Sequence, residues 1–435
     1  MPAKDPELET PLPAVARAEA RPGLLAAFSY RSFRLLWAGA FLSSVGTWIQ
    51  DVALSWLIHA RMGDPFYLGL RSFAQELPLI AFMLLGGAAA DRIDRRLILL
   101  SSQILQMAMA VLLGVLYLTD RLGIVAIVAI AFATGLMQSQ SAPTYQAVIT
   151  SLVPRERIAN AVALNSFQFN LSRAIGPVLA GLLLAHAGAG WCFAANALSF
   201  VAVILALWTI ELPPPIVRPH ESLSESLRAG LRHVARAPRL RGATLLAGAA
   251  SFLAFPLITY LPVIAGDVLQ TGASGYSLLL TSVGIGAIAG ALTTARRGHA
   301  PGRGRLMLRA FCVFGILAVG AALSRWQWLS MLLLVGTGFM LTTAFSTLNS
   351  LVQEAAPDDL RGRVLSIFGL AFRGGGPLGS LLAGFLVRSA GAPLVMAAYA
   401  ATLAGIAFVL LLRKDASHLG GAASHPPGAP LAAPE

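Results

Sequence analysis

Twelve stretches of this chain are long and apolar enough to cross a bilayer as helices, which restricts the possible folds more than any other feature. A membrane helix needs about 20 mostly apolar residues. The stretches are continuous rather than alternating, which excludes barrel strands. They cover approximately residues 33–60, 65–90, 97–119, 122–150, 158–186, 190–210, 242–266, 274–295, 305–324, 327–353, 361–388 and 390–412. The sequence therefore predicts an all-α membrane protein with twelve transmembrane helices.

The charge of the chain is consistent with this interpretation. Of its 435 residues, 56% are hydrophobic and 12% are charged, whereas a soluble domain has about 25% charged residues. The net charge of +12 would suit nucleic acid, but 25 of the 32 Lys and Arg lie on the side of the tails and four on the other. This bias predicts that both termini are cytoplasmic in a bacterial-type inner membrane. We therefore expect the lipid bilayer as a partner and no nucleic acid.

The longest loop divides the twelve stretches into six and six. Both ends of the chain are rich in Pro and Ala and are expected to be disordered cytoplasmic tails. The predicted organisation is an N-tail, a first six-helix bundle, a cytoplasmic linker, a second six-helix bundle and a C-tail, at residues 1–30, 31–210, 211–241, 242–412 and 413–435.

The linker contains a helical pattern of apolar and basic residues. Apolar residues recur at helical spacing, and arginines occupy another face. These residues are Leu223, Leu227, Leu231 and Val234, and Arg228, Arg232 and Arg236. The pattern predicts a short amphipathic helix on the inner leaflet, with a solvated linker helix as the alternative.

The two halves repeat a short motif. RAIGP at Arg173–Pro177 matches RGGGP at Arg373–Pro377. Internal similarity of this kind is typical of a fold built from two related units. We therefore expect two pseudo-symmetric bundles.

A charged loop, GGAAADRIDRRLILL at residues 86–100, joins the second and third stretches. Positive charge at this position fixes topology, but this explains only the arginines, not the two aspartates. The loop resembles the pattern of the major facilitator superfamily, with Asp94 in place of a usual glycine. The matching residues are Gly87, Asp91, Arg92, Arg95 and Arg96.

The resemblance covers about residues 31–412. Within the superfamily, the chain looks most like the branch of enterobactin exporters and macrolide-efflux proteins. Two segments carry this resemblance, SFRLLWAGAFLSSVGTWIQDVALSWLI and VPRERIANAVALNSFQFNLSRAIGPVLAG. It implies the major facilitator fold, with two six-helix bundles that alternate in access.

The resemblance also implies a gating role for the charged loop. In the family, the loop aspartate accepts charge-assisted hydrogen bonds from the start of the eleventh helix, where Arg361 and Arg363 lie here. Such contacts would hold the cytoplasmic side shut.

A second gating element is implied in the fifth stretch. Gly176, Pro177 and Gly181 resemble the Gly-Pro element of the superfamily's exporters. A kink that serves only helix packing is the alternative.

Five charged residues lie well inside the predicted spans, away from their ends, namely Asp51, Arg71, Glu76, Arg173 and Arg373. Burial of charge in a membrane is costly, so these residues are functional candidates. Asp51 and Arg71 lie at similar depth and can form either a structural ion pair or a proton site. Glu76 lies deeper. We expect Asp51 and Glu76 to carry the coupling protons, with Arg71 as the partner of Asp51 in the coupling site.

Polar residues near the middle of the spans are candidates for a substrate cavity. Arg173 and Arg373 can bind a substrate anion, partner an acid or cap kinked backbone carbonyls. Gln138, Asn165 and Gln168 can line a cavity or join helices.

No catalytic motif accompanies these features. The chain has no P-loop, since its two lysines, Lys4 and Lys414, lie in the tails. It has no nucleophile elbow and no zinc-ligand spacing among its histidines. We therefore expect no cofactor and no enzymatic activity.

The predicted function is secondary transport. We expect a monomer that exports a small, fairly hydrophobic drug, macrolide or siderophore in exchange for protons. An importer or lipid flippase on the same fold is one alternative. A membrane receptor or scaffold that transports nothing is another.

Overall fold

The computed structural model describes residues 25–85, 94–212, 223–297, 302–358 and 360–412. Throughout these ranges the regular structure is helical, and they contain no strand. The predicted all-α class is confirmed.

The first part of the chain forms six long helices and three short helical turns. These elements are η1 (Ala26–Ser29), α1 (Arg31–Leu57), η2 (Ile58–Met62), α2 (Phe66–Leu85), α4 (Arg95–Leu118), α5 (Ile124–Ser151), η3 (Arg155–Arg157), α6 (Ile158–His186) and α7 (Ala189–Thr209).

The second part repeats this arrangement after a connecting helix. Its elements are α8 (Leu223–Arg236), α9 (Pro238–Thr259), α10 (Leu261–Val263), η4 (Ile264–Val268), α11 (Gly272–Arg297), α12 (Arg303–Leu323), α13 (Gln327–Ala355), α14 (Arg361–Ala390) and α15 (Ala392–Leu412).

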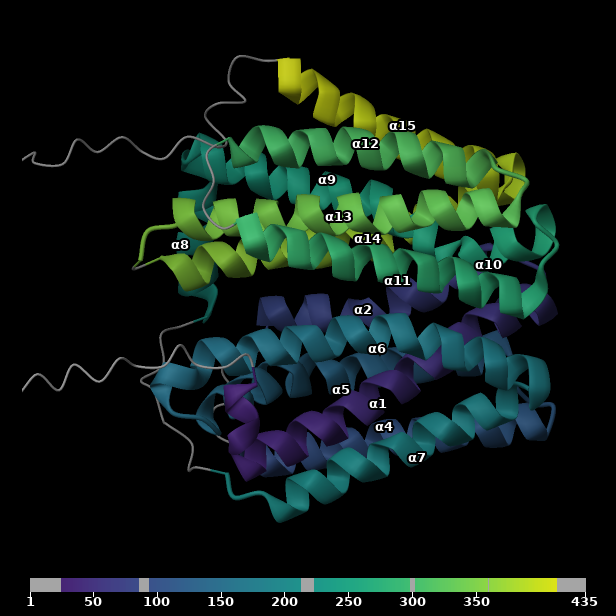
Figure 1. Ribbon diagram of the computed structural model, residues 1–435, viewed down its shortest axis with the longest axis horizontal. Coiled ribbons are helices and arrows are strands. Elements are labelled where there is room, and N and C mark those ends of the chain that lie inside the picture. The colour runs from purple at the N-terminus through teal and green to yellow at the C-terminus, as the bar shows by residue number, and fades with distance from the viewer. Residues whose placement is uncertain (1–24, 86–93, 213–222, 298–301, 359, 413–435) are drawn as a thin grey trace, which may run out of the picture.

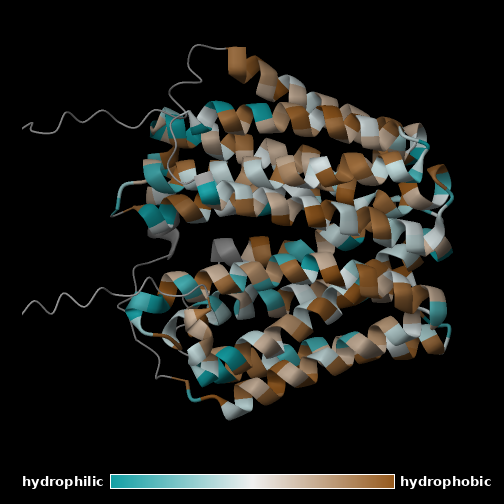
Figure 2. Ribbon diagram, in the orientation of Figure 1, coloured by the Kyte–Doolittle hydropathy of each residue, from teal (hydrophilic) through white to brown (hydrophobic). Residues whose placement is uncertain are grey.

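Within the described ranges, ten helical segments have the length and hydropathy needed to cross a membrane. The ten do not include α1 and α2, which contain 27 and 20 residues and carry three of the five intramembrane charges. These two helices run alongside the others (Figure 1). Figure 2 shows hydrophilic residues gathered at the helix ends, with apolar residues predominating between them. The chain is a multi-pass membrane protein.

The long helices form two groups, one from α1 to α7 and one from α9 to α15 (Figure 1). The groups meet mainly where α2 packs on α14 and where α6 packs on α11. We call the end with α8 and the last residues of α15 the tail end. The opposite end, with the turns between α1 and α2, α6 and α7, and α14 and α15, is the hairpin end.

Glycines allow the same close packing within each group. A Cβ at Gly176 of α6 would lie 3.2 Å from Cγ of Trp48 in α1. A Cβ at Gly376 of α14 would lie 3.2 Å from Cβ of Phe255 in α9. Small residues permit such backbone approach in membrane helices, so the two Gly-Pro motifs occupy related packing positions.

Ordered structure begins before the expected boundary at residue 30. The backbone N–H of Ala27 in η1 donates to Oδ1 of Asn160 at 2.9 Å. The ring of Phe28 lies edge-on to Trp37, with centroids 4.9 Å apart. These contacts with α6 and α1 fix η1 against the first group, which composition alone does not indicate.

The linker helix forms as α8 and packs on α14 and α9. Val234 is buried, whereas Leu231 is 57% exposed. Val234 therefore packs against the bundle, whereas Leu231 faces away from it.

Candidate functional site

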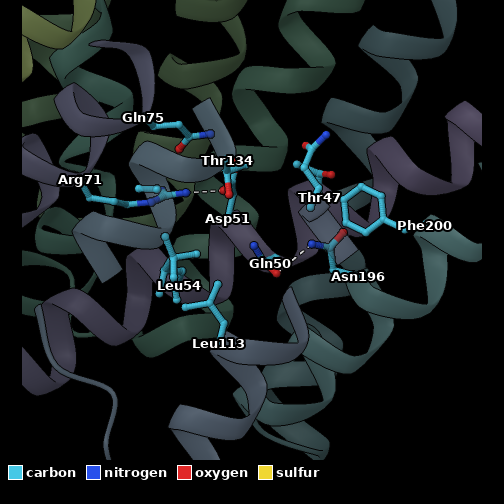
Figure 3. Close-up of a pocket in the computed structure, with 13 residues that line it drawn as sticks. Thr47, Gln50, Asp51, Leu54, Arg71, Gln75, Leu113, Thr134, Asn196 and Phe200 are labelled. Carbon is cyan, nitrogen blue, oxygen red and sulfur yellow. Dashed lines mark hydrogen bonds and ion pairs between the residues drawn. The ribbon is translucent and has the colours of Figure 1, made fainter. Parts of the chain in front are cut away.

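Asp51 of α1 and Arg71 of α2 form an ion pair inside the first group (Figure 3). Arg71 Nη2 donates to Asp51 Oδ1, and Nη1 donates to Ser55 Oγ at 3.3 Å. The structure thus brings together two residues that the sequence placed at equal depth. The pair is partly exposed, with 29% of the Asp51 side chain accessible.

A small polar pocket surrounds this ion pair (Figure 3). Its cavity volume is about 20 Å³, which is enough for one or two water molecules and too little for a drug-sized compound. Asn196 Nδ2 donates to Gln50 Oε1 across it at 2.8 Å. The lining residues are Thr47, Gln50, Asp51, Leu54, Arg71, Gln75, Gln106, Leu113, Ile130, Ala131, Thr134, Asn196 and Phe200. This pocket suits protons and water rather than a substrate.

Glu76 lies one and a half turns further along α2 and is half-buried. In the part of the chain that the structure describes, no hydrogen bond or ion pair engages its carboxyl group. The charges that act on it are those of Arg373 from α14 and Asp51 from α1. Glu76 is therefore an acid without an ion-pair partner among the described residues, under the charge of Arg373 from the second group of helices.

The two motif arginines lie in different surroundings. Arg373 is exposed and faces the charge of Glu76. Arg173 is half-buried, its Nε has no acceptor, and its Cζ lies 6.0 Å from the centroid of the Trp48 ring. Among the described residues, no carboxylate pairs with Arg173.

The candidate amides also differ in their surroundings. Gln168 is 3% exposed and its Nε2 donates to Ser44 Oγ at 3.3 Å. This geometry favours the helix-joining alternative for Gln168. Gln138 and Asn165 are partly exposed and remain candidates for lining a cavity.

The Gly-Pro element of α6 faces the second group of helices. Ser277 Oγ of α11 donates to the carbonyl oxygen of Pro177. A Cβ at Gly181 would lie 2.7 Å from Cβ of Ser277. The Gly181 position therefore fits α6 closely against α11, in addition to any kink.

The two groups are tied together at the hairpin end by an ion pair. Arg388 of α14 donates through Nε to Asp64 Oδ1 at 2.8 Å and through Nη2 to Oδ2. The hydrogen bond from Arg388 holds the pKa of the Asp64 carboxyl below its usual range. Arg388 also lies over the Phe66 ring, 4.6 Å from its centroid.

Other contacts close the same end. His59 Nε2 lies 3.5 Å from Asp267 Oδ1. The hydroxyl of Tyr260 donates to the carbonyl oxygen of Ser380 at 2.8 Å, and a Cβ at Gly69 of α2 would lie 2.8 Å from that hydroxyl. Aromatic and ionic contacts therefore join α1 and α2 to the second group at the hairpin end.

The charged loop lies only in part within the described residues. Gly87, Asp91 and Arg92 fall outside them. Asp94 caps α4 by accepting from the backbone N–H of Arg96 at 2.8 Å, and α4 begins at Arg95.

The described arginines of the predicted gate contact residues of their own group. The side chain of Arg96 donates to the carbonyl oxygen of Ile210. Arg361 pairs with Asp358 at 2.6 Å, and Cβ of Arg363 lies 3.1 Å from a Cβ placed on Gly230 of α8. The contact between α8 and α14 was not predicted.

Sequence reasoning missed the ion pair of Asp64 and Arg388, since Asp64 lies in a short turn and Arg388 lies in the last turn of α14, and both positions look solvated. One available signal was Gly63, whose φ of +67° marks a tight turn that places Asp64 at the start of α2. Its partner, Arg388, lies 324 positions further along the chain. No residue near Asp64 in the sequence indicates this pairing.

Comparisons with known proteins agree with this architecture. Residues 23–428 match the family described as transmembrane secretion effectors. The chain is 26% identical to the staphyloferrin A transporter of Staphylococcus aureus (strain NCTC 8325 / PS 47) over 353 residues, which are 80% of this chain and 88% of the relative. It is also 26% identical to the enterobactin exporter EntS of Shigella boydii serotype 18, over 82% of this chain and 86% of that protein.

Solved structures show the same fold at lower identity. The nucleoside transporter NupG superposes with a TM-score of 0.70 at 13% identity, over 88% of this chain and 100% of that chain. A D-xylose-proton symporter gives a TM-score of 0.68 at 13% identity, over 88% and 96%.

Proposed function

The chain belongs to the transmembrane secretion effector family of the major facilitator superfamily, and on that premise we propose that it exports small, fairly hydrophobic compounds in exchange for protons. That it is a membrane transporter rather than an enzyme follows from its family and relatives. Substrate class, direction and driving ion are the proposed parts.

The observation that carries the proposal is the pair of carboxyl groups in the first group of helices. Asp51 borders a water-sized pocket and pairs with Arg71. Glu76 lies at the boundary with the second group, under the charge of Arg373. Carboxyl groups with partial access, inside a membrane protein, are suited to binding and releasing protons.

Two observations support export. Relatives of this chain include an enterobactin exporter. The element that resembles the Gly-Pro element of exporters, formed by Gly176, Pro177 and Gly181, lies where α6 meets α1 and α11. We propose siderophores, macrolides and related drugs as the substrate range. Arg173 and Arg373, with Gln138 and Asn165, are proposed to line the cavity.

Alternating access completes the proposal. The two bundles, residues 31–210 and 242–412, would rock about a central cavity. In this structure the described ion pairs between them lie at the hairpin end, so substrate would enter from the tail end. We propose that the protein is a monomer in the inner membrane. Its tail end is proposed to face the cytoplasm.

The charged loop is proposed to stabilise the opposite state. Asp91 would accept hydrogen bonds from the start of α14 when the tail end closes. Asp91 lies outside the described residues, and Arg361 pairs with Asp358 in this structure. Closure of the tail end would therefore require Arg361 to exchange partners.

The test is uptake of enterobactin, macrolides and dyes by inverted vesicles with an imposed proton gradient. The wild type is compared with Asp51→Asn, Glu76→Gln and the control Asp120→Asn, whose carboxyl lies in a turn at the hairpin end. Gradient-dependent uptake that either membrane variant loses, and the control keeps, supports antiport. Uptake that does not depend on the proton gradient refutes antiport. Uptake only in right-side-out vesicles supports the importer instead.

A further inference from the structure

Arg173 and Arg373 occupy matching positions in the repeated motif, yet the structure gives only one of them an acidic neighbour. Arg373 faces Glu76 across the boundary between α2 and α14. Arg173 forms no ion pair and no hydrogen bond with any other described residue, and its buried Nε lacks an acceptor. The two halves therefore share the sequence motif but differ in the charged neighbours of its arginine.

A guanidinium inside a membrane protein needs a counter-charge. Arginine does not lose its proton in proteins, and a buried charge without a partner is strongly unfavourable. The described chain supplies Arg173 only with the face of the Trp48 ring, 6.0 Å away. Such a contact compensates only part of the lost hydration.

The backbone holds this arginine and tryptophan in place. Gly176, one turn after Arg173, lies directly against the Trp48 side chain, with 3.2 Å between a Cβ on Gly176 and Cγ of Trp48. On the other side, a Cβ on Gly284 of α11 would lie 3.2 Å from the carbonyl oxygen of Arg173. Arg173 thus stands where α6 touches both α1 and the second group of helices, which is where alternating access places substrate.

We infer that Arg173 and Trp48 form a recognition site for an anionic group on an aromatic or otherwise flat substrate. The guanidinium fork matches a carboxylate in two parallel hydrogen bonds and can also donate to the single oxygen of a phenolate. The indole face supplies stacking for the body of the compound. This inference rests on the proposed function and narrows its substrate class from hydrophobic compounds to hydrophobic anions.

The site also accounts for the different surroundings of the two arginines. Arg373 is exposed and lies within the electrostatic influence of Glu76, so it depends less on a substrate anion. Arg173 has no such partner among the described residues and is free to select. A neutral compound of equal size would leave the Arg173 charge uncompensated and bind more weakly.

The experiment measures equilibrium binding of radiolabelled 1-naphthoate and 1-naphthamide to the full-length protein in lipid nanodiscs. The two probes have the same size and differ in charge. The wild type is expected to bind the carboxylate at least about tenfold more tightly than the amide. Arg173→Gln should remove this preference, while Arg173→Lys should retain part of it.

Arg121→Gln, in an exposed turn at the hairpin end, is the control and should keep the preference of the wild type. Retained binding of the amide by Arg173→Gln shows that the variant is folded, and Arg173→Lys provides the test if Arg173→Gln is not. Equal binding of the two probes by the wild type, binding of neither, or an unchanged preference in Arg173→Gln overturns the inference. The assay uses no gradient, so a preference without proton-driven export would refute the proposed function and leave the site intact.

Discussion

The guanidinium of Arg388 and the carboxylate of Asp64 form two parallel hydrogen bonds across the boundary between the two groups of helices. The residues are 324 positions apart. Parallel hydrogen bonds of this kind fix orientation as well as distance. The pair therefore holds the hairpin end closed in this structure.

Removal of this pair should favour the state that is open at the hairpin end. Arg388→Gln or Asp64→Asn is expected to lengthen the mean distance between spin labels placed at Arg121 and Arg325. These two exposed residues lie in turns of the first and the second group, respectively. The measurement is double electron–electron resonance in nanodiscs.

The control for this experiment is the pair of Arg61 and Asp120, 3.1 Å apart at the same end. Both residues belong to the first group, so Asp120→Asn should leave the label distance unchanged. An equal lengthening in both variants would show that loss of any surface charge opens the structure.

The same pair predicts a dependence of opening on pH. The hydrogen bond from Arg388 lowers the pKa of Asp64 from its ordinary value of 3.8. The contribution of the pair to closure is thus fully present above pH 3.8 and is lost as the pH falls through the lowered pKa. We expect the label distance of the wild type to resist acidification to about pH 4 and to lengthen below it.

Asp64→Asn lacks the titrating group and should show no such acid step. A step of the same size in Asp64→Asn would assign the acid response to other residues.

The ion pair of Asp51 and Arg71 should behave as a coupled unit in unfolding experiments. Either Asp51→Asn or Arg71→Gln leaves one charge without its partner and is expected to lower the free energy of unfolding by about 1–3 kcal/mol. Fully buried pairs lose about 3–5 kcal/mol, and the partial exposure of Asp51 reduces this.

The double variant should lose less than the sum of the two single variants, because it leaves no unpaired charge. Thermal unfolding of the three variants in one detergent measures this coupling. Additive losses would mean that the two side chains contribute independently, despite their contact.

The sequence predicted the helices well because each span carries its own apolar signal. The stretch expected at residues 158–186 is the same as α6 (Ile158–His186). The nearness of Asp51 and Arg71 followed from depth, since consecutive helices rise by equal steps through the bilayer.

Relationships between the two halves could not be predicted in this way. Glu76 comes under the charge of Arg373, and Asp64 pairs with Arg388, only because α2 packs on α14. This packing depends on glycines such as Gly69 and Gly384, whose neighbours lie far away in the sequence. Apolar periodicity reports which residues enter the membrane, and carries no information on which helices of the two halves meet.

Gly384 offers a direct test of this packing. A Cβ at Gly384 would lie 2.9 Å from Cα of Phe66 in α2 and 2.7 Å from the Tyr260 hydroxyl. Because backbone cannot move aside as a side chain can, Gly384→Ala should push α2 from α14 and destabilise the closed hairpin end by about 1–3 kcal/mol.

Gly405 of α15 is the matched control, since nothing lies within 4 Å of a Cβ placed there. Gly405→Ala should be neutral or stabilise the protein by up to about 1 kcal/mol through its higher helix propensity. Gly384→Ala should lengthen the distance between the labels at Arg121 and Arg325, and Gly405→Ala should not. If Gly384→Ala leaves that distance unchanged, α2 and α14 do not set the closure of the hairpin end, and the ion pair of Asp64 and Arg388 must hold it alone.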